Sequence, residues 1–99
     1  MNMQQLMMQA QKMQREMQKA QAELAKKEFS KNKNGLVNIT MLGDKTVTKI
    51  DIDQDALEKD NKEMIEEMIL SAINELIAEI CAEEEAITAK VQGGARMGF

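Results

Sequence analysis

The chain has 99 residues, enough for one small domain, and carries a net charge of −4 with 10 Met, two Phe, one Cys and no His, Trp, Tyr or Pro. The absence of His excludes imidazole catalysis, and the single Cys81 excludes an internal disulfide or a thiolate zinc site. The longest apolar run has three residues, too few to cross a membrane, and the first residues lack the pattern of a secretory signal. We therefore expect a cytoplasmic protein that is not an enzyme and has no cofactor, metal, membrane partner or small-molecule substrate.

Charge is divided unevenly between the two halves of the chain. Residues 1–50 carry a net charge of +5, and residues 51–99 carry −9. Because the halves differ in sign, the overall charge is a poor guide to what any one surface binds. An acidic chain can therefore still present a basic surface in its first half.

Residues 3–27 are predicted to form one long helix, roughly 37 Å in length at ~1.5 Å per residue. Apolar residues recur there at alternating steps of three and four, which is the heptad pattern of a coiled-coil seam. The seam positions are Met3, Leu6, Ala10, Met13, Met17, Ala20 and Leu24. Because the seam is narrow and rich in Met and Ala, we expect this helix to need a partner helix.

Basic side chains line a second face of the same predicted helix, away from the apolar seam. Lys12, Arg15 and Lys19 are spaced three and four residues apart, and Lys26 follows one heptad after Lys19. Such a face is commonly a solvated surface, here partly neutralised by two nearby glutamates. The alternative is a contact surface for an anionic partner.

The middle of the chain is predicted to be a three-stranded antiparallel meander over residues 28–52. Apolar and polar residues alternate in its central strand, as expected for a strand with one buried face. The expected segments are a strand at 28–30, a polar loop at 31–35, a strand at 36–42 and a strand at 45–52.

A two-residue turn is expected at Gly43-Asp44, with glycine supplying the positive φ of a type II′ turn. Counting outward from this turn places Ile39 opposite Thr48 and Val37 opposite Ile50. One face of the sheet then needs a cover, and it holds Val37, Ile39, Met41, Ile50 and Ile52.

Residues 60–90 are predicted to form a second, acidic helix. Pairs of apolar residues recur every four positions from Met64 to Cys81, which makes a stripe wide enough to cover the sheet and also to meet another helix. Residues 93–99 are predicted to be a flexible, Gly-rich tail. The fold class expected for residues 1–92 is α+β in α-β-β-β-α order, with a small antiparallel three-stranded sheet flanked by two long helices.

The apolar surface left over on both helices predicts a symmetric homodimer, which would also offset the small core of a chain this size. The expected dimer interface consists of Met13, Met17, Leu24, Ile69, Ile73, Leu76, Ile77 and Ile80.

Two central segments resemble the YbaB/EbfC family of nucleoid-associated proteins. GLVNITMLG at 35–43 is similar to that family's G-L-V-x-V-T-hydrophobic-x-G strand, and IDID at 50–53 with ALEKDNKEMIEEMI at 56–69 resembles its I-D-P-x-L-L-E-D-D-K-E-x-L-E-D-L block. The Gln- and Met-rich first helix and the Gly-rich tail also match in character. The resemblance implies a tweezer-like bacterial homodimer that binds double-stranded DNA with little sequence preference and is associated with the nucleoid in the cytoplasm.

The second helix carries more Glu than is usual in this family and would repel phosphate, so DNA contacts are expected from the first helix and the meander. With almost no aromatic side chains to stack on bases and only two Arg, contacts to phosphate should dominate and depend strongly on salt. The candidate DNA-binding residues are Lys12, Arg15, Lys19, Lys26, Lys27, Lys31, Lys33, Lys45 and Lys49.

A different class of protein also fits part of the pattern. The order of long helix, hairpin and long helix resembles prefoldin subunits, which hold apolar clients, and a Met-rich seam suits adaptable packing. The alternative to DNA binding is therefore a prefoldin-like chaperone or a structural helical scaffold. A salt-titrated duplex-binding assay separates these functions.

Overall fold

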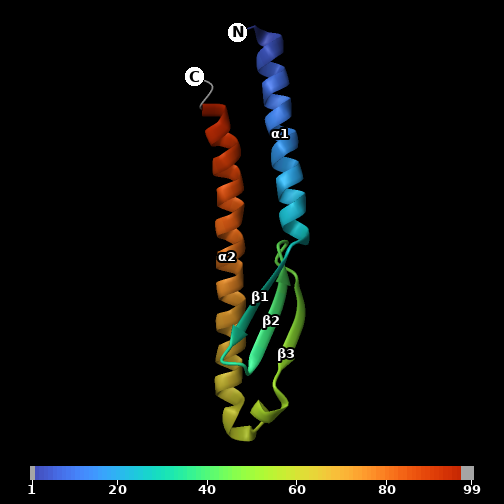
Figure 1. Cartoon of the computed structure of the whole chain (residues 1–99). Coiled ribbons are helices and arrows are strands. Elements are labelled where there is room, and N and C mark those ends of the chain that lie inside the picture. The colour runs from blue at the N-terminus through green and yellow to red at the C-terminus, as the bar shows by residue number, and fades with distance from the viewer. Residues whose placement is uncertain (1, 97–99) are drawn as a thin grey trace.

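The computed structural model describes residues 2–96, which form an elongated rod measuring 69 × 20 × 15 Å (Figure 1). A long helix, three antiparallel strands and a second long helix follow one another, which confirms the predicted α-β-β-β-α order. The elements are α1 (Met3–Lys26), β1 (Glu28–Lys33), β2 (Val37–Leu42), β3 (Val47–Ile52), the short 3₁₀ turns η1 (Gln54–Ala56) and η2 (Lys59–Asn61), and α2 (Lys62–Arg96).

Helix α1 begins at a polar cap and ends where the backbone becomes extended. The Asn2 side chain accepts a hydrogen bond from the backbone N–H of Gln5 at 2.8 Å, which satisfies one of the free donors of the first turn. Between its ends the helix consists mainly of Gln, Met, Lys, Ala and Glu, which are good helix formers. Lys27 then adopts extended angles and leads into β1. The helix predicted at 3–27 is thus confirmed to within one residue.

Strands β1 and β2 pair around a tight turn that contains Asn34 and Gly35. Both residues have positive φ, 55° and 72°, which Asn and Gly adopt more readily than other residues. The loop predicted at 31–35 is wrong in part, because Lys31–Lys33 continue β1. Their polar side chains concealed the strand, since two of its inward-facing positions hold Lys where a strand normally places apolar residues.

The loop between β2 and β3 differs from the predicted type II′ turn. The N–H of Lys45 donates to the carbonyl of Leu42 at 2.8 Å, and Lys45 has a φ of 71° whereas Gly43 has no positive φ. Gly43 is required for another reason, because a Cβ atom there would lie only 1.8 Å from the carbonyl oxygen of Leu24. The N–H of Gly43 also donates to the carbonyl of Lys27 at 2.9 Å. The loop therefore packs directly against the end of α1.

The longer loop and an irregularity late in β2 change the strand register. Ile39 lies opposite Ile50 and not Thr48, and Val37 lies opposite Ile52. Because the shift along most of the strand is two residues, the same side chains still point to the inner face of the sheet. The predicted inner face is therefore kept, although its cross-strand partners differ.

The hydrophobic core lies between the inner face of β2 and one stripe of α2. Val37, Ile39 and Met41 are at most 1% exposed, and Leu76 of α2 is fully buried against them. Helix α2 packs across β1 and β2, and β3 is the edge strand of the sheet that lies farthest from α2 (Figure 1). For this reason Ile50, predicted to be covered, is 50% exposed.

Helix α1 runs antiparallel beside the second half of α2 (Figure 1). Leu24 is buried and Met13 and Met17 are half-buried, whereas Met3 and Leu6 at the other end of the seam are 77% and 50% exposed. The sequence pattern left this seam to a second chain. In the structure, the half of the seam nearest the sheet packs against α2 of the same chain.

Helix α2 is longer than the predicted helix at 60–90. It begins at Lys62, after η2, and continues to Arg96, so residues 93–96 are helical and not part of a tail. The two glycines at 93–94 weaken a helix by ~1 kcal/mol each relative to Ala but do not forbid it. The rest of the predicted tail, 97–99, lies outside the described residues.

Candidate nucleic-acid interface

The outward side of α1 carries what we call the basic stripe: Lys12, Arg15, Lys19 and Lys26. All four side chains are exposed. At 100° per residue, Arg15, Lys19 and Lys26 lie on the side of α1 away from α2, and Lys12 lies at the edge of the stripe, where it also borders the groove between the helices. From Lys12 to Lys26 the helix rises about 21 Å, which is the length of about six base pairs of duplex DNA. Among the side chains that the structure describes, none of the four forms an ion pair.

Three other candidate lysines are paired with glutamates of α2, in what we call the lysine–glutamate ladder. Its rungs join Lys27 Nζ to Glu83 Oε1 at 2.9 Å, Lys31 Nζ to Glu79 Oε1 at 2.5 Å, and Lys33 Nζ to Glu75 Oε2. The ladder therefore fastens the end of α1 and the whole of β1 to one flank of α2.

The ladder shifts the pKa of two of its members, Lys31 and Glu75. The hydrogen bond from Lys31 to Glu79 raises the pKa of the Lys31 ammonium above its ordinary value of 10.5. The hydrogen bond from Lys33 lowers the pKa of Glu75 below its ordinary value of 4.5. Both shifts favour the charged forms of these two groups, so the rungs that contain them are ion pairs at neutral pH.

The remaining two candidate cations lie on or beside β3. Lys45, in the loop before β3, places its Nζ 3.0 Å from Glu84 Oε1, and this hydrogen bond raises the pKa of Lys45. Lys49 pairs with Thr40 in the sheet, on the face that points away from α2, and it is exposed. Of these two lysines, Lys49 is the one that a nucleic acid could neutralise without displacing a glutamate.

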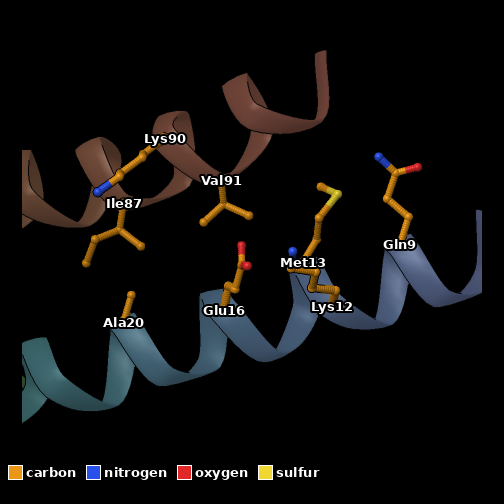
Figure 2. A pocket seen from close by; sticks show the side chains of 8 residues that line it. All are labelled: Gln9, Lys12, Met13, Glu16, Ala20, Ile87, Lys90 and Val91. Carbon is orange, nitrogen blue, oxygen red and sulfur yellow. The ribbon is translucent and has the colours of Figure 1, made fainter. Parts of the chain in front are cut away.

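A groove of about 560 Å³ lies between the two helices (Figure 2). The Glu16 side chain extends from α1 toward α2 in this groove, among apolar side chains such as Met13 and Val91. The groove lining combines this carboxylate with Lys12 and Lys90, so the groove holds less net positive charge than the basic stripe with its four cations. Its lining consists of Gln9, Lys12, Met13, Glu16, Ala20, Ile87, Lys90 and Val91.

The predicted dimer-interface residues divide into two groups. Leu24, Leu76 and Ile80 are buried within the chain itself and are at most 7% exposed. The others remain half-buried, and they are Met13, Met17, Ile69, Ile73 and Ile77. The first three residues already complete the core of one subunit, so a second chain could reach them only if this core opened.

Exposed and half-buried apolar side chains remain on β3 and on one flank of α2, and we call this set the apolar strip. The Lys45–Glu84 ion pair fixes this flank on the β3 side, because Glu84 and Ile77 are seven residues apart and share a helix face. Ile50 and Leu70 are 50% and 64% exposed. The strip consists of Val47, Ile50, Leu70, Ile73 and Ile77.

Two periodicities in the sequence correspond to the ladder. Lys31 and Lys33 are two residues apart and so share one face of a strand, while Glu75, Glu79 and Glu83 recur every four residues on one helix face. Matching these two periodicities suggests ion pairing, but only the fold establishes that the two faces meet.

Metal binding and membrane insertion would each require a specific structural feature. Over the residues that it describes, no three His, Cys, Asp or Glu side chains gather as metal ligands. Neither helix, so far as it is described, has an apolar stretch long enough to cross a bilayer.

Comparison with known proteins gives one consistent result. The model of the YbaB/EbfC DNA-binding family matches residues 1–95. A nucleoid-associated protein of Agathobacter rectalis is 39% identical over 94 residues, covering 94% of this chain and 83% of the relative. A nucleoid-associated protein of Enterococcus faecalis is 38% identical over 94 residues, covering 94% of this chain and 90% of the relative. A nucleoid-associated protein of Mycoplasmopsis pulmonis is 34% identical over 94 residues, covering 95% of this chain and 93% of the relative.

Proposed function

This chain belongs to the YbaB/EbfC DNA-binding family, and from that premise we propose that it is a bacterial nucleoid-associated protein that binds duplex DNA as a homodimer. In this proposal the contacts are made mainly to phosphate, with low sequence specificity. The observation that carries the proposal is the basic stripe, whose four cations are exposed and form no ion pair among the side chains that the structure describes.

The chemistry of the stripe favours phosphate over bases as its ligand. Three of its four members are Lys, which acts as a point charge, and only Arg15 could form the bidentate contact that reads guanine. Four phosphate contacts per subunit give a slope of log K against log salt concentration of about −3.6, or about −7 for a dimer, at ~0.9 per contact. Binding should therefore weaken steeply between low and physiological salt.

The other candidate cations have different weights in this proposal. Lys49 is exposed and adds a contact from the sheet. Each of the four remaining lysines already has a carboxylate partner, so each contributes less to phosphate binding. They are Lys27, Lys31, Lys33 and Lys45.

A homodimer would double the basic stripe, and the apolar strip of β3 and α2 is the proposed contact between the copies. A surface used by both subunits about a two-fold axis must be complementary to itself, and apolar side chains meet this requirement without any pairing of opposite charges. The strip includes Ile73 and Ile77 of the interface predicted from the sequence and replaces the buried Leu24, Leu76 and Ile80 by Val47, Ile50 and Leu70.

The test is a salt-titrated duplex-binding assay on the wild type and on a triple variant with Lys12→Glu, Arg15→Glu and Lys19→Glu. The triple variant should lose duplex binding while its circular dichroism spectrum and thermal unfolding stay those of a folded protein. A matched comparison uses two double variants with the same change in charge: Lys12→Glu/Lys19→Glu within the stripe, and the control Lys59→Glu/Lys62→Glu at and just before the start of α2.

The outcomes of this assay separate the alternatives. Equal loss of affinity in the two double variants would show that net charge, and not the stripe, decides binding. A wild type that binds no duplex even at ~50 mM salt but suppresses aggregation of an unfolded client would favour the chaperone-like function.

A further inference from the structure

The lysine–glutamate ladder lies along an element that could otherwise add positive charge to the DNA-binding surface. Lys27 directly follows the last residue of α1, one position after Lys26 of the basic stripe. Lys31 and Lys33 follow along β1. Without carboxylate partners, these lysines would extend the positive surface from α1 onto the sheet.

The spacing of the two elements makes the pairing systematic. Two residues of a strand advance about 6.6–6.8 Å, and four residues of a helix advance about 6 Å. Lys33 and Lys31 therefore match Glu75 and Glu79 rung by rung, in antiparallel order. Lys27, beyond Phe29, then reaches Glu83.

The rungs are half-exposed, so a phosphate group can reach the same lysines. The side chain of Lys31 is 28% exposed and that of Glu79 is 46% exposed. A glutamate carboxylate and a DNA phosphate are both anions that accept hydrogen bonds from an ammonium group, so they compete for one cation. The carboxylate has the advantage of being held in place by the fold, whereas the phosphate must be recruited from solution.

We propose that Glu75, Glu79 and Glu83 act as built-in competitors of DNA phosphate, which keep Lys27, Lys31 and Lys33 from contacting the duplex and leave binding to the basic stripe and Lys49. This inference rests on the proposed function. In this inference the glutamates of α2 do more than repel DNA through their charge. Only a glutamate that is paired with a lysine competes with phosphate for that lysine.

The decisive variant is Glu75→Gln/Glu79→Gln, which keeps side-chain size and removes two competing charges. If Lys31 and Lys33 then contact phosphate, the slope of log K against log salt concentration steepens by about 1.8 per subunit. Each recruited lysine changes the slope of log K against log salt concentration by ~0.9. If the contact adds nothing to affinity at 1 M salt, this slope raises the affinity at 0.1 M salt about eightfold for each recruited lysine.

The matched control is Glu63→Gln/Glu67→Gln, which has the same change in net charge at two exposed glutamates of α2 outside the ladder. The inference expects a steeper slope and a larger gain in affinity for the ladder variant than for this control. Equal gains in the two variants would mean general repulsion and would overturn it. A ladder variant that binds no more tightly than the wild type would also overturn it.

A second pair of substitutions covers the case in which the glutamate variant fails to fold. In the otherwise unchanged protein, Lys31→Gln/Lys33→Gln should leave duplex affinity and salt slope nearly unaltered, because these lysines are already neutralised. A loss of about eightfold per lysine at 0.1 M salt would show direct DNA contact and overturn the inference. A wild type that binds no duplex at low salt would instead contradict the proposed function itself.

Discussion

The close approach between Gly43 and the end of α1 gives a sharp prediction about how the fold is held together. In Gly43→Ala the added methyl carbon would lie 1.8 Å from the carbonyl oxygen of Leu24 and 2.6 Å from its carbonyl carbon. Both atoms belong to the backbone, so no side chain can rotate away to make room. The loop before β3 and the end of α1 must therefore separate.

The cost of this separation can be worked out from two contributions. Overpacking of a well-packed site costs ~1–3 kcal/mol. Loss of the 2.9 Å hydrogen bond from the Gly43 N–H to the Lys27 carbonyl adds ~0.5–1.5 kcal/mol. A total of about 2–4 kcal/mol lowers the Tm by about 10–30 °C for a domain of this size.

The assay is thermal unfolding followed by circular dichroism at one protein concentration, because the Tm of an oligomer depends on concentration. The matched control is Gly35→Ala. Gly35 has a φ of +72°, but a Cβ atom there meets nothing within 4 Å, so this variant has only backbone strain of about 1 kcal/mol. If Gly35→Ala proves as destabilising as Gly43→Ala, or more so, the assigned contact between the loop and α1 is wrong.

Two further predictions concern assembly and pH. The double variant Ile50→Glu/Leu70→Glu should convert the proposed dimer to a monomer by light scattering after size exclusion. Met8→Glu, at a site on α1 that is 63% exposed, should leave the dimer intact; dissociation of both variants would count against the strip as the interface. Because the folded pKa of Glu75 lies below its ordinary value of 4.5, its ion pair with Lys33 contributes stability above pH 4.5 that is lost as the pH falls through the lowered pKa. Urea midpoints measured across this range should therefore fall less in Glu75→Gln than in the wild type, and an identical fall would show that the Lys33–Glu75 pair does not contribute.

Local periodicity in the sequence was sufficient to predict the elements and their order. The three–four spacing from Met3 to Leu24 predicted α1, and the alternation around Ile39 predicted β2 and its inner face. Each of these signals reports which side of an element is apolar, and that depends only on nearby residues. The basic stripe could be identified for the same reason, because its spacing and the spacing of the seam lie within one helix.

Which surfaces meet was decided only by the tertiary structure. The heptad seam indicated a need for a partner helix, but not that α2 of the same chain would cover Met13 and Met17. The sequence pattern predicts a positive φ at Gly43, whereas the actual constraint there is the backbone of Leu24, nineteen residues earlier. The polar pattern of Lys31–Lys33 predicts a loop, because the pairing of this segment with β2 and with the glutamates of α2 involves residues far away in the sequence.

The sequence by itself therefore determined the helices, the sheet, their order and the outward-facing cations of α1. The tertiary structure decided which of the nine candidate cations are neutralised by glutamate and which apolar residues remain for a second copy. The physical reason is that periodicity reports the faces of a single element, whereas ion pairs and buried contacts require two elements to be brought together at a defined register and distance.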